Sequence, residues 1–250
     1  MGEISKHGNG DSPVPESAPA SGDRFEKIAS NYGELFTEVF AEQGLDYGKI
    51  EESVFDAVKK LVPNLKEIPI LDIGVGDGKT SEPFLKAGCE RVVGIDTNPE
   101  MIKAATAKFG DAIKLILMDA RDMSFKPGEF PVIVSANAVH NISRQERIKF
   151  WQQMLRLSPD IFVSADKIVD PNPEKHKENF NREVTAIKKV FGQKHNLPDA
   201  EKVWLDHYDY DERERLELDE IESAIGKEYD IEVVFEMGMN KTIVAKKKET

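Results

Sequence analysis

Short apolar segments that alternate with helical patterns constrain the fold of this chain most. Five segments rich in Val, Ile and Leu have the length of buried strands: residues 68–73, 91–95, 113–118, 132–136 and 161–165. Helical patterns follow at residues 79–87, 99–109 and 143–157. Strands separated by helices predict an α/β fold with a mostly parallel, doubly wound sheet. Ligands of such sheets bind outside the carboxyl ends of the strands.

The C-terminal residues predict a closing pair of antiparallel strands. Residues 231–236 and 241–246 have strand-like patterns, and a turn near Gly238 and Asn240 joins them. With the five earlier segments, they predict a seven-stranded sheet that is mostly parallel and has an antiparallel C-terminal strand.

Two of the helices carry recognisable start signals. Asn98 followed by Pro99 is typical of an N-cap and a first helical residue. Ser143 and Glu146 have the spacing of a capping box, in which each side chain bonds a backbone N–H of the other residue. We expect the helices to begin at these positions.

The segments outside the sheet differ in composition. Residues 1–22 are rich in Gly, Ser and Pro, which predicts a disordered tail, and residues 23–250 are expected to form a single domain. Residues 24–62 predict two N-terminal helices, and residues 168–228 predict a long, polar and mostly helical insert. Because both segments can cover the carboxyl edge of the sheet, we expect them to form a helical cap.

The composition argues against several classes of function. The 250 residues carry a formal net charge of −12, which disfavours binding to nucleic-acid phosphates. The single cysteine, Cys89, precludes an intrachain disulfide and fits a reducing compartment. No apolar run approaches the ~20 residues of a membrane span, and the N-terminus lacks the apolar core of a signal peptide. A cytoplasmic protein is therefore expected.

A glycine-rich loop follows the first predicted strand. It reads Asp72-Ile73-Gly74-Val75-Gly76-Asp77-Gly78-Lys79-Thr80. A phosphate-binding P-loop would require a glycine at Ile73, and a dinucleotide fingerprint would require one at Lys79. The glycines still permit close approach of a ligand to the backbone. Asp72 and Asp77 favour a cationic ligand over a pyrophosphate.

The remaining pattern, Asp-x-Gly-x-Gly-x-Gly, resembles the first motif of the Rossmann-like (class I) S-adenosylmethionine-dependent methyltransferases of the small-molecule type. The resemblance covers roughly residues 24–167 and the two terminal strands. It implies S-adenosylmethionine as cofactor, S-adenosylhomocysteine as product and methyl transfer by in-line displacement. It also implies a cofactor site at the loops after successive strands, formed by Tyr32, Asp72, Gly74, Gly76, Asp96, Thr97, Asp119, Ala120 and Asn137.

The resemblance gives several of these residues separate roles. Asp96 is expected to accept hydrogen bonds from the ribose hydroxyls. Asp119 is expected to accept one from the adenine amino group, with the backbone N–H of Ala120 at the ring. Asn137 follows the fourth strand, where family members place backbone contacts and a substrate-facing residue.

The N-terminal helix matches a second pattern of the family. Phe25, Ala29 and Tyr32 fit the Phe-x-x-x-Ala-x-x-Tyr opening of many small-molecule methyltransferases, whose first helix folds over the cofactor. Tyr32 is therefore expected to touch the methionine part of the cofactor or the substrate. The chain departs from the family at Ser158, which lies in Leu-Ser-Pro-Asp instead of the usual Pro-Gly-Gly turn.

The acceptor is expected to be a small molecule, and its nucleophile is left open. A general base is needed only if that nucleophile must lose a proton. The candidate catalytic residues are His140, Tyr32 and Tyr208, with Arg182 and His207 as further polar candidates. His176, Glu183 and His195 do not form a convincing metal-ligand set, so no metal is predicted.

Three alternatives remain open at this point. The chain could bind S-adenosylmethionine without catalysis, or it could be a nicotinamide-dependent oxidoreductase. It could also modify the cofactor itself, because the long insert permits a resemblance to carboxy-S-adenosylmethionine synthase.

Overall fold

The computed structural model describes residues 32–249 and contains a seven-stranded sheet with the order β3-β2-β1-β4-β5-β7-β6. The strands are β1 (Ile70–Ile73), β2 (Val92–Asp96), β3 (Lys114–Leu117), β4 (Val132–Ala136), β5 (Ile161–Lys167), β6 (Tyr229–Met237) and β7 (Asn240–Lys247). Strands β1 to β5 pair in parallel, whereas β7 runs antiparallel to both β5 and β6. The predicted fold class, including the antiparallel last strand, is confirmed.

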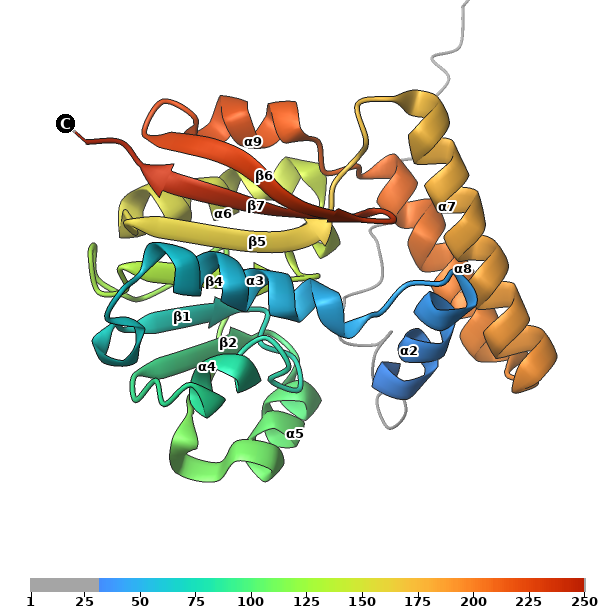
Figure 1. Cartoon of the computed structure of the whole chain (residues 1–250), viewed down its shortest axis with the longest axis horizontal. Helices are drawn as coiled ribbons and strands as arrows, with labels where there is room; N and C mark the ends of the chain where they lie inside the picture. Colours follow the sequence, from blue (N-terminus) through green and yellow to red (C-terminus); the bar gives the residue numbers. More distant parts are fainter. Residues whose placement is uncertain (1–31, 250) are drawn as a thin grey trace, which may run out of the picture.

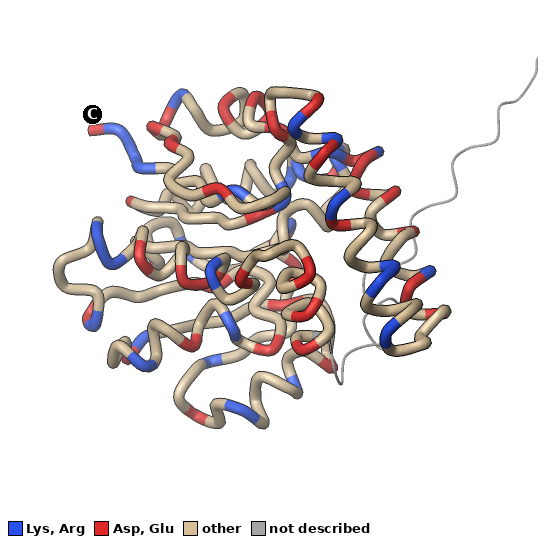
Figure 2. The backbone as a smooth tube through the Cα atoms, turned by 45° about the vertical axis from the view of Figure 1, so that its right-hand side comes forward, with Lys and Arg blue, Asp and Glu red and all other residues tan. Residues whose placement is uncertain are grey.

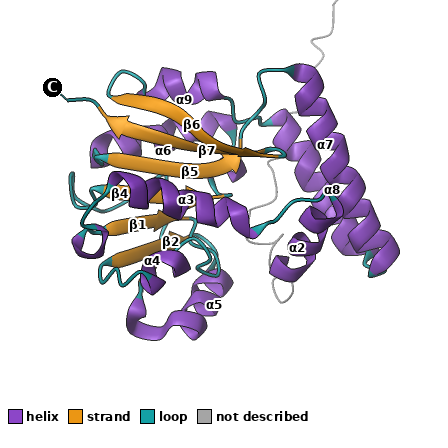
Figure 3. Cartoon of the chain, viewed as in Figure 1, coloured by secondary structure: helices purple, strands orange, loops and turns teal. Residues whose placement is uncertain are grey.

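Helices cover both faces of this sheet (Figures 1 and 3). The α-helices are α2 (Tyr32–Glu42), α3 (Gly48–Leu61), α4 (Glu82–Lys86), α5 (Pro99–Phe109), α6 (Arg144–Leu157), α7 (Pro173–Ile187), α8 (Pro198–Arg213) and α9 (Leu218–Ile225). Four shorter helical segments are η1 (Leu65–Glu67), η2 (Gly110–Ala112), η3 (Val139–Asn141) and the π-helix η4 (Lys188–Lys194). Helix α3 lies along β4 and β5, and α6 packs against α9.

Alternation along the strands divides the core into two clusters. Val132 and Val134 of β4 point to the side covered by α3, whereas Ile133 points to the side covered by α6 and α9. Successive side chains of a strand face opposite ways, so an unbroken apolar strand supplies both clusters. This explains why the buried strands read as continuous apolar runs in the sequence.

The two predicted helix starts have different outcomes. Asn98 caps α5 as expected, because its side chain accepts a hydrogen bond of 2.9 Å from the backbone N–H of Glu100. Helix α6 begins after Ser143 as expected, but the predicted capping box is wrong because the Ser143 side chain makes no capping bond. The carboxylate of Glu146 pairs with Arg121 instead, and this ion pair competes with the local bond.

Three helices gather at the carboxyl ends of the parallel strands. Helix α2 packs against α7 and η4, and α7 packs against α8, to one side of the sheet (Figure 1). Phe36 anchors α2 there, with its ring centroid 4.4 Å from that of Trp204 and 6.1 Å from that of Phe191. We call α2, α7, η4 and α8 the helical cap. The other helices of the predicted cap segments, α3 and α9, lie against the sheet.

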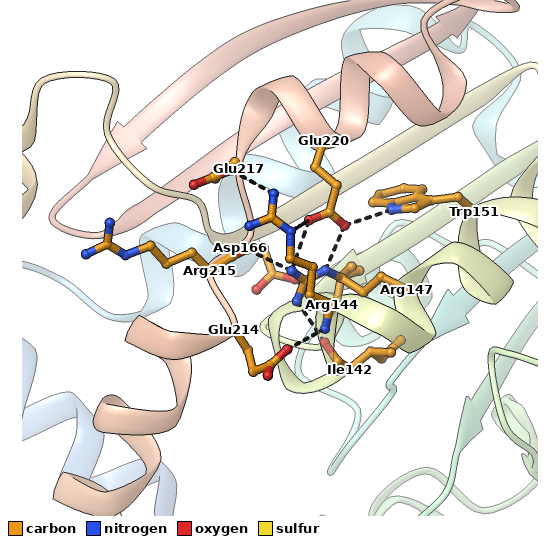
Figure 4. A network of polar contacts seen from close by, with 10 residues as sticks. Ile142, Arg144, Arg147, Trp151, Asp166, Glu214, Arg215, Glu217 and Glu220 are labelled. Carbon is orange, nitrogen blue, oxygen red and sulfur yellow. Dashed lines mark hydrogen bonds and ion pairs between the residues drawn. The ribbon is translucent and has the colours of Figure 1, made fainter. Parts of the chain in front are cut away.

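The insert returns to the sheet close to where it leaves. Ile168 and Leu216 form a parallel bridge, and the N–H of Val169 donates to the carbonyl of Leu216 at 2.9 Å. Beside it, the fully buried guanidinium of Arg147 donates to Glu220 and to the carbonyls of Ile142 and Arg215 (Figure 4). These contacts fasten the end of the insert to α6.

The surface of the cap is mixed in charge. Figure 2 shows Lys and Arg interspersed with Asp and Glu along its helices. Within residues 32–249, no helix has the length and apolar composition that crossing a bilayer requires. The sequence-based predictions for residues 1–22, Phe25 and Ala29 concern positions outside the described residues.

Candidate active site

The glycine-rich loop is shaped by three backbone conformations with positive φ. Gly74, Gly76 and Gly78 have φ values of 69°, 54° and 85°. A Cβ on Gly74 would lie 2.4 Å from the Cβ of Ala138, and one on Gly78 would lie 2.2 Å from the ring of Phe109. A Cβ on Gly76 would meet nothing nearer than a backbone oxygen at 4.0 Å. The loop is thus packed at both ends and open at its middle glycine.

Asp72 lies beneath this loop rather than on its open side. Its carboxyl is fully buried, and one oxygen accepts a hydrogen bond of 2.6 Å from the hydroxyl of Ser81. The other oxygen, Oδ1, has no hydrogen-bond partner among the described residues. Burial raises the pKa of Asp72 to about 7, against the lowering effect of Ser81. A positively charged ligand above the loop would favour the ionised form.

Asp96 connects the loops that follow β1 and β2. One carboxylate oxygen accepts from the N–H of Gly76 at 2.9 Å, and the other accepts from the N–H of Asn98 at 2.8 Å. Burial raises the pKa of Asp96, although these backbone bonds oppose the shift. The side chain stays partly exposed beside the exposed Thr97, so each oxygen can still accept from a ligand hydroxyl.

The carboxylate of Asp119 forms an ion pair with Arg121. Arg121 donates to both of its oxygens, at 2.9 and 3.0 Å from Nε. Burial disfavours the charge of Asp119, but the hydrogen bonds from Arg121 lower its pKa overall. Both Asp119 and Ala120 are partly exposed at the carboxyl end of β3.

Asn137 follows β4 in a left-handed conformation, with φ of 52°. Its N–H donates to the carbonyl of Ala165 on β5 at 2.8 Å, and its carbonyl accepts from the side chain of Asn141 at 2.9 Å. The residue is therefore fixed between the end of β5 and the turn after β4, and its neighbour Ala138 packs against Gly74 of the glycine loop. It also lines a cavity.

That cavity has a volume of about 30 Å³ and lies between the cap and the strand ends. Its lining residues come from the cap, from the turn before α3, from the loop after β4, from the end of β5 and from the start of β7: Phe36, Phe40, Tyr47, Asn137, His140, Asn141, Lys167, Glu183, Trp204, His207 and Asn240. Asn240 is 2% exposed, and neither amide atom of its side chain has a hydrogen-bond partner among the described residues. Buried amides normally have partners, so this side chain is suited to a ligand.

Two histidines with carboxylate partners face the same cavity. His140 pairs through Nδ1 with the buried carboxylate of Asp166. His207 lies with its ring centroid 5.7 Å from that of His140, and its Nε2 is 3.5 Å from an oxygen of Asp211. The pairing at Nδ1 leaves Nε2 of His140 as the ring nitrogen for a ligand. Such an imidazole can accept a proton or bind a metal ion.

Lys167 connects these groups at the end of β5. Its ammonium donates to Asp211 at 2.9 Å and lies 3.7 Å from the centroid of the Tyr208 ring. Burial alone would raise the pKa of Asp211, but the charge of Lys167 lowers it overall. Burial raises the pKa of Glu183, whose carboxyl accepts from the hydroxyl of Tyr208.

The remaining predicted candidates lie elsewhere. Tyr208 is fully buried and is not among the cavity's lining residues. Arg182 is exposed and pairs with Glu178. Tyr32 begins α2, and its side chain lies outside the described part of the chain. His176 pairs with Glu212 and His195 with Glu38, so neither reaches the cavity.

Sequence reasoning missed four residues of this region. Asp166 and Lys167 directly follow the predicted fifth strand, and a search of its carboxyl end would have found them. Asp211 stands four residues after His207, a spacing that places both on one helix face. Asn240 belongs to a predicted turn, and no sequence signal marks it as buried.

The residues present fit S-adenosylmethionine. Gly76 leaves open space above the loop, Asp96 presents partly exposed oxygens, and Asp72 supplies a buried acid with an unpaired oxygen. The open space above Gly76 would let the cofactor approach the backbone of the loop. Asp96 would lie near the ribose of the cofactor, and Asp72 near its positive charge.

Comparisons with known proteins show similarity to methyltransferases in sequence and in fold. Residues 70–159 match the sequence model of a methyltransferase domain. An uncharacterized methyltransferase of Geobacillus sp. strain WCH70 is 27% identical over 147 residues, which are 58% of this chain and 62% of that protein. The alignment thus spans less than two thirds of this relative's length.

Solved structures share the fold. Magnesium protoporphyrin IX methyltransferase from Synechocystis PCC 6803, with bound S-adenosylmethionine, aligns with a TM-score of 0.56 and 13% identity over 91% of this chain and 95% of that one. The plantazolicin methyltransferase BpumL, in complex with S-adenosylhomocysteine, aligns with a TM-score of 0.60 and 18% identity over 92% of each chain. The chain is therefore similar in sequence to methyltransferase domains over residues 70–159, and it shares the fold of solved S-adenosylmethionine-dependent methyltransferases.

Proposed function

We propose that the protein transfers the methyl group of S-adenosylmethionine to a small-molecule acceptor whose reacting group enters the cavity beneath the cap. The observation that carries this proposal is Asn240, a buried amide that lines the cavity without a hydrogen-bond partner among the described residues. An unpaired buried polar group is costly unless a ligand or water satisfies it. A polar group of the acceptor is the partner proposed here.

The position of the cavity supports methyl transfer. Asn137 lines it and lies directly after β4, next to the glycine loop that holds the cofactor in this proposal. The lone pair of the acceptor atom forms a bond to the methyl carbon, and the carbon–sulfur bond breaks with its electron pair going to sulfur. The products are the methylated acceptor and S-adenosylhomocysteine, and a protic acceptor also releases one proton. The enzyme contributes alignment and exclusion of water.

The cavity dimensions define what part of the acceptor is enclosed. A volume of about 30 Å³ holds a small reacting group rather than a whole molecule. The remainder of the acceptor extends from the cavity mouth along the cap. Phe36, Phe40 and Tyr47 give the cavity an aromatic wall, which suits an acceptor with an apolar group.

Replacement of Asn240 by leucine tests the proposal. This substitution removes an amide that has no described partner, so the free energy of unfolding should stay unchanged or rise. Affinity for S-adenosylhomocysteine, measured by calorimetry, should stay unchanged, whereas the KM for the acceptor should rise about tenfold. Asn179→Leu is the matched control, because this partly buried amide donates to the carbonyl of Gly238 and is not among the cavity residues.

The acceptor is found by incubating the protein with methyl-labelled cofactor and fractions of a metabolite extract. Label in a small-molecule product supports the proposal. Label only in a protein or RNA fraction would contradict the acceptor class. Binding of the cofactor with no labelled product in any fraction would favour a non-catalytic binding protein.

A further inference from the structure

We propose that His140, His207 and Asp211 bind a divalent transition-metal ion of the Zn²⁺ type in the cavity. All three side chains are buried, and one potential ligand atom from each lies within 4.8 Å of the others. Two imidazoles and one carboxylate form a donor set that such ions use in catalytic sites, with further positions left open. Metal binding itself does not depend on the proposed methyl transfer.

The geometry is near that of a metal site. Ligand atoms at ~2.0–2.1 Å from a tetrahedral ion are about 3.4 Å apart. The distance from Nε2 of His207 to Oδ2 of Asp211, the oxygen that also accepts from Lys167, is 3.5 Å, which already fits. The widest pair is at most 4.8 Å apart, so coordination requires a closure of no more than about 1.4 Å. His140 and His207 both line the cavity, where an ion has room.

A second shell orients the ligands. Asp166 holds Nδ1 of His140, which is the carboxylate–histidine arrangement that fixes metal-binding imidazoles. The backbone N–H of Val139 donates to the other oxygen of Asp166 at 2.8 Å, so this carboxylate is itself fixed. Lys167 holds one oxygen of Asp211 at 2.9 Å.

An unpaired atom and the local charge point to a cation. Oδ1 of Asp211 is buried and has no hydrogen-bond partner among the described residues, although the other oxygen of this carboxylate is bonded to Lys167. The buried carboxylates of Asp166 and Asp211 carry two negative charges, Asp166 pairs with His140, and Lys167, which pairs with Asp211, supplies one ammonium. A divalent ion would offset this excess of negative charge and satisfy the unpaired oxygen.

The ion would make the cavity prefer acceptors that carry a metal-binding oxygen atom. Asn137 and Asn240 line the same cavity as His140 and His207, so an oxygen atom of the acceptor would reach the ion from that space. This step rests on the proposed function. It narrows the acceptor class to molecules that carry a hydroxyl or carboxylate able to coordinate a metal.

Calorimetry with the metal alone tests the site. The full chain, without a histidine tag and stripped of metal, is titrated with Zn²⁺ and separately with Mg²⁺, in the absence of cofactor. We expect about one Zn²⁺ per chain with a Kd in the micromolar range or below, and no binding of Mg²⁺. Co²⁺ should bind at the same site and give visible absorption bands of a low-coordinate complex.

Substitutions assign the ligands. His207→Ala and Asp211→Asn should each weaken Zn²⁺ binding about 100-fold, and Asp166→Asn, which removes a positioning group, should weaken it about 10–100-fold. His195→Ala should bind as the wild type does, because His195 pairs with Glu38 at the surface. Circular dichroism and binding of S-adenosylhomocysteine confirm that each variant is folded.

Two results would overturn the metal site. One is the absence of saturable Zn²⁺ binding by the wild type. The other is Zn²⁺ binding of wild-type affinity in both His207→Ala and Asp211→Asn. Either result leaves the proposed methyl transfer standing, since binding of S-adenosylhomocysteine and labelled product are measured separately.

Discussion

The hydroxyl of Ser81 donates a hydrogen bond of 2.6 Å to the buried carboxyl of Asp72. This contact joins the end of β1 to the turn that precedes α4, across the base of the glycine loop. It also explains why α4 begins at Glu82 and not at the predicted residue 79, because Ser81 turns inward before the helix starts.

The buried Asp72 predicts a specific pH dependence of stability. Its pKa rises from 3.8 to about 7 on burial, so the unfolded chain ionises more readily than the folded one. The wild type should therefore lose stability relative to Asp72→Asn as the pH rises from about 4 to about 7. Urea unfolding of both proteins across this range measures the difference. If the free energies of unfolding of the two proteins changed equally with pH, Asp72 would be ionised without penalty in the folded protein.

Substitution of Gly74 in the glycine loop should destabilise the protein more than substitution of Gly44, a glycine outside the loop that also has positive φ. Ala at Gly44, where φ is 72° and no atom lies within 4 Å, should cost about 1–2 kcal/mol from backbone strain alone. Ala at Gly74 adds a clash at 2.4 Å with Ala138, which should cost a further ~1–3 kcal/mol and weaken S-adenosylhomocysteine binding. Thermal unfolding and calorimetry check both values. Equal losses in the two variants would contradict the tight packing of the loop.

Asp96 predicts a loss of cofactor affinity on truncation. Asp96→Ala should weaken S-adenosylhomocysteine binding by roughly 1–3 kcal/mol, because polar partners on the ligand and in the protein lose their acceptor. Isothermal calorimetry measures the change, with the exposed Asp111→Ala as a control for net charge. Unchanged affinity in Asp96→Ala would exclude the ribose contact.

Substitution of the two arginines that contact Glu220 should reduce the free energy of unfolding by different amounts. Arg147 is fully buried and also bonds two backbone carbonyls, so Arg147→Met should destabilise the fold by about 3–5 kcal/mol. Arg144 has a side chain that is 56% exposed, so Arg144→Met should cost less than about 1 kcal/mol. Chemical denaturation separates these values. Similar losses in both variants would show that the network of Figure 4 does not depend on burial.

The sheet could be predicted because its determinants are local. The boundaries of β4 and α5 agree with the predictions to the residue, since apolar runs and the Asn98 cap act over a few positions. The capping box was wrong because Ser143 makes no capping bond and the carboxylate of Glu146 pairs with Arg121, which is distant in sequence. Local patterns do not reveal such competition.

The cavity could be predicted only in part, for the same physical reason. His140 was found because it follows a strand, at an edge where ligands bind. Its neighbours His207 and Asn240 come from a helix and a turn far along the chain, and only the packing of the cap brings them together. For Asp119, the position at the end of a strand could be predicted, but its ion pair with Arg121 could not.

The bridge between Ile168 and Leu216 gives residues 169–215 the character of an exchangeable cassette. The chain leaves the sheet and rejoins it at nearly one point, so the cassette can change in length or sequence without shifting the register of any strand. The cost of closing such a loop grows only slowly with its length. The cofactor loops lie outside the cassette, after β1, β2, β3 and β4. Grafting a cassette from a relative should therefore replace the cavity wall formed by Glu183, Trp204 and His207, while Asn240 and the cofactor loops keep their positions.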